Sequence, residues 1–316
     1  MTWLLPALKV VAILLVLLTI PVGLTWFERR LLAWFQDRYG PNRVGPFGLL
    51  QPVADGIKLL LKEDWLPPFA DRLVFTLAPA ILVVTVLLAF GVIPFDPKIR
   101  ISDLNVGLLV FLGLTSLGVY SIVLAGWSSN SKYSLIGGLR ATAQMISYEI
   151  PMGISVVGVV MLSGSFRLGA IVEAQRSLWF AVAQPIGLLV FLTAAIAEAR
   201  RIPFDLPEAD AEIIAGYHTE YSSLKFGMFY LGEYLDITLV GCMTTALFLG
   251  GWHGPWLPPL VWFALKTGAV IVFFVWVRAA LPRFRFDQLM DFGWKVLIPL
   301  SLLNVVITAT LALWGK

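Results

Sequence analysis

The sequence predicts an all-α polytopic membrane protein with eight transmembrane helices and an interfacial amphipathic helix in the first inner loop. Composition is the first observation behind this fold class: 59% of the 316 residues are hydrophobic and 14% are charged, whereas about a quarter of a soluble domain is charged. The second is that apolar windows of about 20 residues, the length that crosses a bilayer, recur along the chain. We expect residues 1–316 to form a single integral membrane domain.

Each predicted span is an apolar window bounded by charged or turn-forming residues. The eight windows cover residues 4–27, 73–95, 104–126, 142–163, 178–197, 226–250, 257–279 and 293–314. The first is interpreted as a retained span, because the N-terminus lacks the basic region and small-residue cleavage site of a signal peptide. The fourth has the weakest apolar signal because it contains Glu149 and Pro151.

Lysine and arginine are unevenly divided between the two sets of loops. Loops 28–72, 127–149, 198–225 and 278–295 hold 7, 2, 3 and 4 of these residues, and the opposite loops 96–103, 164–177 and 251–256 hold 2, 2 and 0. By the positive-inside rule, the long, basic loops face the cytoplasm or its equivalent. An even number of spans then places both termini outside, and we expect polar function at the inner face.

The first inner loop is predicted to contain the interfacial helix. Its start is indicated by two Gly-Pro pairs, at Gly40 and Gly45, which are typical of a stiff turn. After the turn, apolar and polar residues fall on opposite faces of a helix that is too short to span. The apolar face would hold Leu50, Val53, Ala54, Ile57 and Leu60, and the polar face Gln51, Asp55, Lys58 and Lys62.

Few residues of the chain are suited to hold a metal or a redox centre. Cys242 is the single cysteine, and His218 and His253 are the two histidines. Iron–sulfur clusters and zinc sites need several such ligands, so we expect no metal, haem or iron–sulfur cluster bound by this chain. If the chain takes part in redox chemistry, the electrons come from a partner. The net charge of +3 is too small to indicate nucleic-acid binding.

Carboxylates lie in several predicted spans, where an ionisable side chain is expensive and indicates function by default. These residues are Glu149, Glu198, Glu233 and Asp236, and the third inner loop adds Asp205, Glu208, Asp210, Glu212 and Glu220. One interpretation is a buried chain that handles protons. The other is a set of structural ion pairs with arginines 140, 200, 201 and 278. The joint pattern favours the first, because a solvated acidic loop does not need carboxylates inside the neighbouring spans.

Arginines and aromatic residues gather at the inner end of the first span. Arg29 and Arg30 are interpreted as topology signals, while Arg38 and Arg43 are better placed to hold a partner surface or a ligand. The aromatic residues are Trp26, Phe27, Trp34, Phe35 and Tyr39. Most are interpreted as an interfacial aromatic belt, and some could line an opening for a lipophilic ring.

The four inner loops resemble those of a known family, the H-type membrane subunit of NADH-quinone oxidoreductase (respiratory complex I). The first block is "ERRLLAWFQDRYGPNRVGPFGLLQPVADGIKLLLKED", residues 28–64, and the second is "GWSSNSKYSLIGGLRATAQMISYEI", residues 126–150. The third is "EARRIPFDLPEADAEIIAGYHTEYSSLKFGMFYLGEY", residues 198–234, and the fourth is "RAALPRFRFDQLMDFGWK", residues 278–295. The blocks are long and in order along the chain.

The resemblance implies a subunit of the bacterial inner membrane, or its organelle equivalent, at the joint between an electron-transfer arm and a proton-pumping arm. Its implied partners are peripheral subunits, one carrying the terminal iron–sulfur cluster, together with small membrane subunits and antiporter-like subunits. Quinone is the implied substrate, with no flavin bound by this chain. The implied quinone-binding residues are Trp26, Phe27, Arg29, Arg38, Arg43, Asp55 and Lys58. The implied proton path is Glu149, Glu198, Asp205, Glu208, Glu212, Glu220 and Glu233.

Three other functions remain open from the sequence. A homologous subunit of an energy-converting hydrogenase, or of a ferredoxin- or deazaflavin-linked dehydrogenase, shares the general "PFDLPEA" pattern. The long first loop and "GYHTEYSSLKF" favour the quinone enzyme. A secondary transporter acting alone would place its charged site near the bilayer midplane. A purely structural anchor for a peripheral arm would make the carboxylates dispensable.

Overall fold

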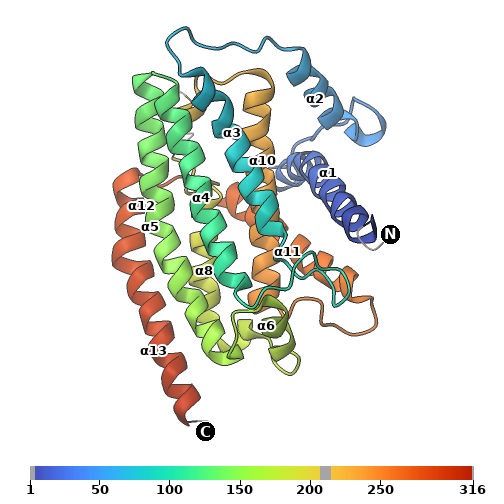
Figure 1. Cartoon of the computed structure of the whole chain (residues 1–316), viewed down its shortest axis with the longest axis vertical. Coiled ribbons are helices and arrows are strands. Elements are labelled where there is room, and N and C mark those ends of the chain that lie inside the picture. The colour runs from blue at the N-terminus through green and yellow to red at the C-terminus, as the bar shows by residue number, and fades with distance from the viewer. Residues whose placement is uncertain (1–3, 207–214, 315–316) are drawn as a thin grey trace.

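The computed structural model describes residues 4–206 and 215–314, and all the regular structure within them is helical (Figure 1). The α-helices are α1 (Leu4–Phe35), α2 (Gln51–Leu61), α3 (Arg72–Phe90), α4 (Gly107–Ser128), α5 (Lys132–Ser163), α6 (Leu168–Ala174), α7 (Phe180–Ala183), α8 (Pro185–Glu198), α10 (Ser223–Phe248), α11 (Pro259–Ala280), α12 (Phe286–Phe292) and α13 (Ile298–Trp314). Two 3₁₀ turns, η1 (Pro46–Gly48) and η2 (Gly216–His218), and one π-helical turn, η3 (Gly293–Leu297), complete the order. The all-α class is therefore confirmed for the described residues.

In the described part of the chain, 7 helical stretches are long and apolar enough to cross a membrane. They are Val10–Phe35, Arg72–Phe90, Gly107–Ser128, Lys132–Ser163, Ser223–Phe248, Pro259–Ala280 and Phe286–Trp314. The fourth predicted window, 142–163, lies within α5, which starts at Lys132, so much of the expected second inner loop is helical. The protein is thus an integral membrane protein, as the sequence predicts.

The predicted span 178–197 is not one continuous helix. It is divided into α7 and the 14-residue α8, with Gln184 between them at φ −136° and ψ 62°. Gln184 precedes Pro185, and a residue before proline is disfavoured in the helical region. A 14-residue helix rises about 21 Å, less than the roughly 30 Å hydrocarbon core. An eighth span, made of α7 and α8 together, stays a prediction.

Helix α10 forms the core of the bundle. It contacts α1, α3, α8 and α11, and Figure 1 shows it between α3 and α11. Every residue from 232 to 248 is buried. A charged group on this helix must therefore find its partners inside the protein or in a neighbouring subunit, because neither lipid nor bulk water surrounds it.

Glycines allow close approach between α5 and its neighbours. A Cβ atom on Gly126 of α4 would lie 3.3 Å from the Cα of Gly138 in α5. A Cβ on Gly137 would lie 2.7 Å from the backbone of Gly216 in η2. Membrane helices pack closely through such small residues. These contacts fix the second half of the third inner loop against α5.

Helices α1 and α2 lie at one side of the bundle (Figure 1). They are joined by an ion pair in which Arg29 Nη1 lies 2.8 Å from Asp55 Oδ2. An α-helix, α2, forms in the first inner loop, and the described residues include no buried side chain on it; its interfacial, amphipathic character stays a prediction. Its apolar residues Val53, Ile57 and Leu60 are 50%, 51% and 61% exposed. The described residues therefore leave these side chains only partly covered.

The substitution Gly137→Ala is expected to lower the free energy of unfolding by about 1–3 kcal/mol, because the new methyl group has to displace backbone atoms. Gly153→Ala, in the same helix, is the matched control, because a Cβ at Gly153 has no neighbour within 4 Å. Thermal unfolding of the two purified variants measures the difference. Equal midpoints would show that η2 is not held against α5.

Candidate functional site

The first of two buried ionic clusters is centred on Arg201, in the loop that follows α8. Its Nη1 lies 3.0 Å from Glu28 Oε1 on α1, and its Nε lies 2.8 Å from Glu233 Oε1 on α10. Arg278, at the end of α11, donates a second hydrogen bond to the same Glu28 oxygen. One guanidinium therefore links α1, α10 and, through Glu28, α11.

The Arg201 cluster is well enclosed. Glu28, Arg201 and Glu233 are each less than 10% exposed. The Arg201 guanidinium lies over the Tyr234 ring, 4.6 Å from the ring centroid. Burial lowers the pKa of Arg201, but the nearby Glu233 and Glu28 outweigh that effect and raise it, so the guanidinium stays charged.

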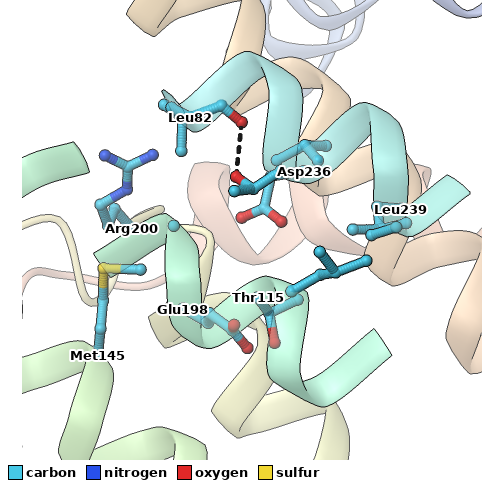
Figure 2. Close-up of a pocket in the computed structure, with 12 residues that line it drawn as sticks. Leu82, Thr115, Met145, Glu198, Arg200, Asp236 and Leu239 are labelled. Atoms are coloured by element: carbon cyan, nitrogen blue, oxygen red, sulfur yellow. Dashed lines mark hydrogen bonds between the residues drawn. The ribbon is translucent and has the colours of Figure 1, made fainter. Parts of the chain in front are cut away.

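The second cluster lines a small internal cavity between α3, α4, α5, α8 and α10. Figure 2 shows the carboxylates of Glu198 and Asp236 facing this space, with Thr115 beside Glu198. The cavity volume is about 20 Å³, enough for one water molecule. Glu198 Oε2 is buried and has no hydrogen-bond partner among the described residues. A buried carboxylate oxygen therefore lies beside a cavity that can hold one water molecule.

Arg200 belongs to this second cluster although it is the sequence neighbour of Arg201. It is 1% exposed, and its Nη1 donates a 2.7 Å hydrogen bond to the hydroxyl of Tyr217. Its backbone has φ +54°, the left-handed region that a non-glycine residue adopts at a cost. This conformation ends α8 and directs two successive arginines to two different clusters.

Four carboxylates, those of Glu149, Glu198, Asp236 and Glu233, lie near one another in this order and are called the row below. Glu149 on α5 accepts a hydrogen bond from Ser116 and lies close enough to Glu198 for their charges to interact. Glu198 interacts in the same way with Asp236, and Asp236 with Glu233. Glu233 and Asp236 are three residues apart on one helix, which places them on neighbouring positions of its surface.

The loop after α8 holds Asp205 against this region. Gln144 of α5 donates hydrogen bonds of 2.8 Å to the Ala197 carbonyl and 2.7 Å to the Phe204 carbonyl, which fixes the loop. Asp205 Oδ2 pairs with Arg283 Nη2 at 3.0 Å. Burial raises the pKa of Asp205 to about 6, although Arg283 opposes that shift. This carboxyl group therefore changes protonation near neutral pH.

Part of the predicted proton path is brought together by the structure. Glu149, Glu198 and Glu233 lie in the row, and Asp205 is fixed near its Glu233 end. Glu220 lies half-buried between η2 and α10. Residues Glu208 and Glu212, like Asp210, lie outside the described residues.

Several members of the site are not among the residues that the sequence selects. The sequence pattern presents Glu28 as the end of a span, and Arg200 and Arg201 as ordinary ion-pair partners. Asp236 stands out as a carboxylate in a span but is absent from the implied path. A usable signal exists for it, since it follows Glu233 by three residues within an apolar run. Glu28 has none, because its partner Arg201 is 173 residues away in sequence.

The residues predicted to bind quinone divide into paired and exposed groups. Arg29 pairs with Asp55, and Trp26 Nε1 donates a 3.2 Å hydrogen bond to the Phe47 carbonyl. In the turn after α1, Arg38 Nε donates a 2.8 Å hydrogen bond to Gln36 Oε1. Phe27, Arg43 and Lys58 are exposed. All of them gather around α1, α2 and the turn between these helices, and none lines the cavity beside Glu198 or the smaller one beside Glu28.

Metal ligands are not clustered within residues 4–206 and 215–314. No group of three or more histidine, cysteine, aspartate or glutamate side chains is arranged there to hold a metal ion. The expected absence of a metal, haem, flavin or iron–sulfur centre stays a prediction.

Comparison with known proteins gives a consistent result over nearly the whole chain. A family model described as NADH dehydrogenase matches residues 8–309. The chain is 55% identical over 309 residues to the first NADH-quinone oxidoreductase H subunit of Geobacter metallireducens, covering 95% of this chain and 94% of the relative. It is 58% identical over 305 residues to the H subunit of the same enzyme from Methylococcus capsulatus, covering 96% of each. The second H subunit of Syntrophobacter fumaroxidans is 52% identical over 318 residues, covering 98% of this chain and 96% of the relative.

Replacing Arg201 with methionine is expected to lower the free energy of unfolding by about 3–5 kcal/mol, because Glu233 and Glu28 lose a buried partner. Adding Glu233→Gln to Arg201→Met should recover part of the loss, since one uncompensated charge is then removed. The exposed pair of Arg285 and Asp287 supplies the control, and Arg285→Met should change little. Unfolding midpoints of the assembled protein measure the effect, and additive losses in the double variant would contradict the ionic account.

The raised pKa of Asp205 predicts a pH dependence. The folded protein binds this proton more tightly than the unfolded chain between pH 3.8 and about 6. The contribution of Asp205 to stability therefore falls as the pH rises through that window and stays lower above it. In Asp205→Asn this fall should be absent from a plot of unfolding midpoint against pH. Asp291→Asn, at a 63% exposed side chain, should keep the parental curve. Identical curves for Asp205→Asn and the parent would refute the assignment.

Proposed function

The chain belongs to the NADH dehydrogenase family, and we propose that, as a membrane subunit of the multi-subunit NADH-quinone oxidoreductase, it forms part of the quinone chamber and couples quinone reduction to proton translocation. The single observation that carries this proposal is the row of carboxylates that runs from Glu149, which is half-buried, through the buried Glu198 and Asp236 to the buried Glu233. Ionisable groups at membrane depth mark proton relays and ion pathways. The names of the relatives indicate the enzyme to which the chain belongs. The row of carboxylates indicates that the role of this chain is in proton transfer.

The reaction needs protons as well as electrons. A quinone takes up two electrons and two protons to become a quinol. In this proposal the electrons come from the terminal iron–sulfur cluster of a peripheral subunit. This chain's carboxylates supply and redistribute protons. Glu198 lies within range of the charges of Glu149 and Asp236, and Asp236 lies within range of Glu233. The four carboxylates are therefore placed to pass protons along the row.

Arg200 and Arg201 fix the charges around the row. Arg201 holds Glu233 in an ion pair, so this carboxylate is charged unless the pair opens. Glu198 lies beside the water-sized cavity, its Oε2 has no hydrogen-bond partner among the described residues, and it is the better group to accept and release a proton. Negative charge that develops on a nearby quinone would favour protonation of the row. Asp205, Glu208, Glu212 and Glu220 in the third inner loop are proposed to connect the chamber with it.

The quinone is proposed to enter beside α1 and α2. The residues proposed to contact it are Trp26, Phe27, Arg29, Arg38, Arg43, Asp55 and Lys58. The apolar side chains on α2 are half exposed, which suits a helix lying in the interface, where a lipophilic ring and tail arrive. The ion pair of Arg29 with Asp55 would hold the two sides of this opening at a set distance.

Partners and orientation follow from the same surface. Trp34 and Tyr39, at the end of α1 and in the turn after it, are 77% and 91% exposed, and Phe69, just before α3, is 80% exposed. Large exposed aromatic residues favour docking of other subunits. We propose that peripheral-arm subunits cover this end, and that small membrane subunits and antiporter-like subunits adjoin the row. The basic loops would then face the cytoplasm of a bacterial inner membrane, with both termini outside.

The rival functions are less well supported. The matched relatives are named as quinone oxidoreductase subunits rather than hydrogenase or deazaflavin-linked subunits. A transporter acting alone would need its site near the midplane between broken helices. Here the carboxylates come from the end of α8 and from the middle of α5 and α10, and the matched relatives are named as subunits of an oxidoreductase rather than as transporters. A structural anchor would not need the unpartnered oxygen of Glu198 beside a cavity.

The variants Asp236→Asn and Glu198→Gln test the proposed coupling. Each should lower quinone-reductase activity and proton pumping together by roughly tenfold or more, a typical loss when a proton-transfer group is removed. Glu173→Gln, at a 53% exposed carboxylate outside the row, is the control and should retain both. Quinone-dependent NADH oxidation and vesicle acidification of assembled enzyme are the measurements. Full pumping in both variants, with assembly intact, would exclude the row from the mechanism.

A further inference from the structure

The connection between α10 and α11 presents one tryptophan completely to the surroundings. Trp256 is 102% exposed, the largest exposed fraction among the large hydrophobic side chains described. Its backbone has φ +66°, a region that a bulky residue rarely occupies and that costs free energy. An indole held outward in an unfavourable conformation indicates an external binding partner.

The backbone around Trp256 cannot relax freely. Trp262 Nε1 donates a 2.8 Å hydrogen bond to the Pro255 carbonyl, and the Leu257 amide donates to the same oxygen at 2.8 Å. Pro258 follows directly and fixes its own φ. The strain at Trp256 is therefore maintained by contacts on both sides of it.

Lys266 of α11 holds the first half of this connection in place. Its Nζ donates to the carbonyls of Leu249 at 2.5 Å, Gly251 at 3.0 Å and His253 at 2.7 Å. The ammonium group also lies 4.4 Å from the ring centroid of Trp179. A buried lysine is expensive unless its donors are satisfied, and here backbone carbonyls at the end of α10 satisfy them. These contacts give Lys266 a structural role.

The position of Trp256 along the chain identifies its surroundings. It lies three residues before α11, whose apolar run begins at Pro259. Leu257, Leu260 and Val261 are 45%, 43% and 40% exposed beside it. The connection extends to the side of the bundle (Figure 1) and, from residue 251 to 258, carries no aspartate, glutamate, lysine or arginine. An uncharged connection at the end of an apolar helix suits the boundary between hydrocarbon and headgroups, where tryptophan is enriched.

We propose that Trp256 is a membrane anchor whose indole ring inserts at the headgroup–acyl boundary of the leaflet at the α10–α11 end. The brace made by Lys266 and Trp262 fixes the depth of the ring. The anchor sets the vertical position of α11, which carries Arg278 at its other end. The proposal does not depend on the quinone or proton functions.

Photochemical labelling of the assembled enzyme tests the anchor. A phenylalanine bearing a diazirine replaces Trp256, and the complex is placed in nanodiscs of dioleoylphosphatidylcholine. After irradiation, the mass of this chain reports what the carbene met: one added phospholipid, one added water, or a cross-link to another subunit. Lys98, an exposed residue in the connection between α3 and α4, receives the same label as the matched position.

The expected result is a phospholipid adduct at Trp256 at least about fivefold more abundant than at Lys98. A dominant water adduct, or a dominant cross-link to another subunit, would overturn the proposal. In a second sample, Lys266→Met is combined with the label at position 256. The lipid adduct should then fall severalfold, because the loop is no longer held. An unchanged lipid adduct in that sample would refute the role of Lys266 as the brace.

Discussion

The guanidinium of Arg201, buried between Glu28 and Glu233, is the interaction on which the arrangement of the bundle depends. A charge in this position is tolerated only when its partners are close and correctly placed. Those partners come from α1 and α10, and Arg278 of α11 shares Glu28 with it. Helix α1, which has few buried residues, is thus tied to the core by charge. The same charges give the interior an electrostatic frame in which other carboxylates can change protonation.

Two features bring the carboxylates of the two clusters into one continuous row. The left-handed backbone at Arg200 separates it from Arg201, so that neighbouring residues serve different clusters. The three-residue spacing of Glu233 and Asp236 then connects these clusters along α10. Coupling between them is therefore built into one turn of one helix. This geometry supports the proposed proton function more strongly than the number of acidic residues does.

The sequence was sufficient for the helical class, for most spans and for several of the acids, because apolar length and the cost of membrane charges are local properties. It was insufficient for the pairing, since Glu28 and Arg278 are 250 residues apart and nothing local indicates their contact. The helix break at Gln184 could have been predicted from Pro185, because a residue before proline disfavours the helical conformation. The prediction of one continuous span considered hydropathy alone. The position of the third inner loop depended on Gln144 and Gly137, which have no distinctive pattern in sequence.

The enclosure of α10 from residue 232 to residue 248 also bears on biogenesis. Its mean hydropathy is 1.2, the lowest of the 7 candidate spans, whereas the span at α3 reaches 2.7. A segment that contains Glu233 and Asp236 partitions poorly from the translocon into lipid by itself. The earlier segment α8 and the arginines that follow it precede α10 in synthesis and offer the polar partners it needs, with Glu28 of α1 sharing Arg201. Integration of α10 is therefore expected to be a cooperative, protein-assisted event, and loss of an early partner would leave this helix stranded at the insertion machinery.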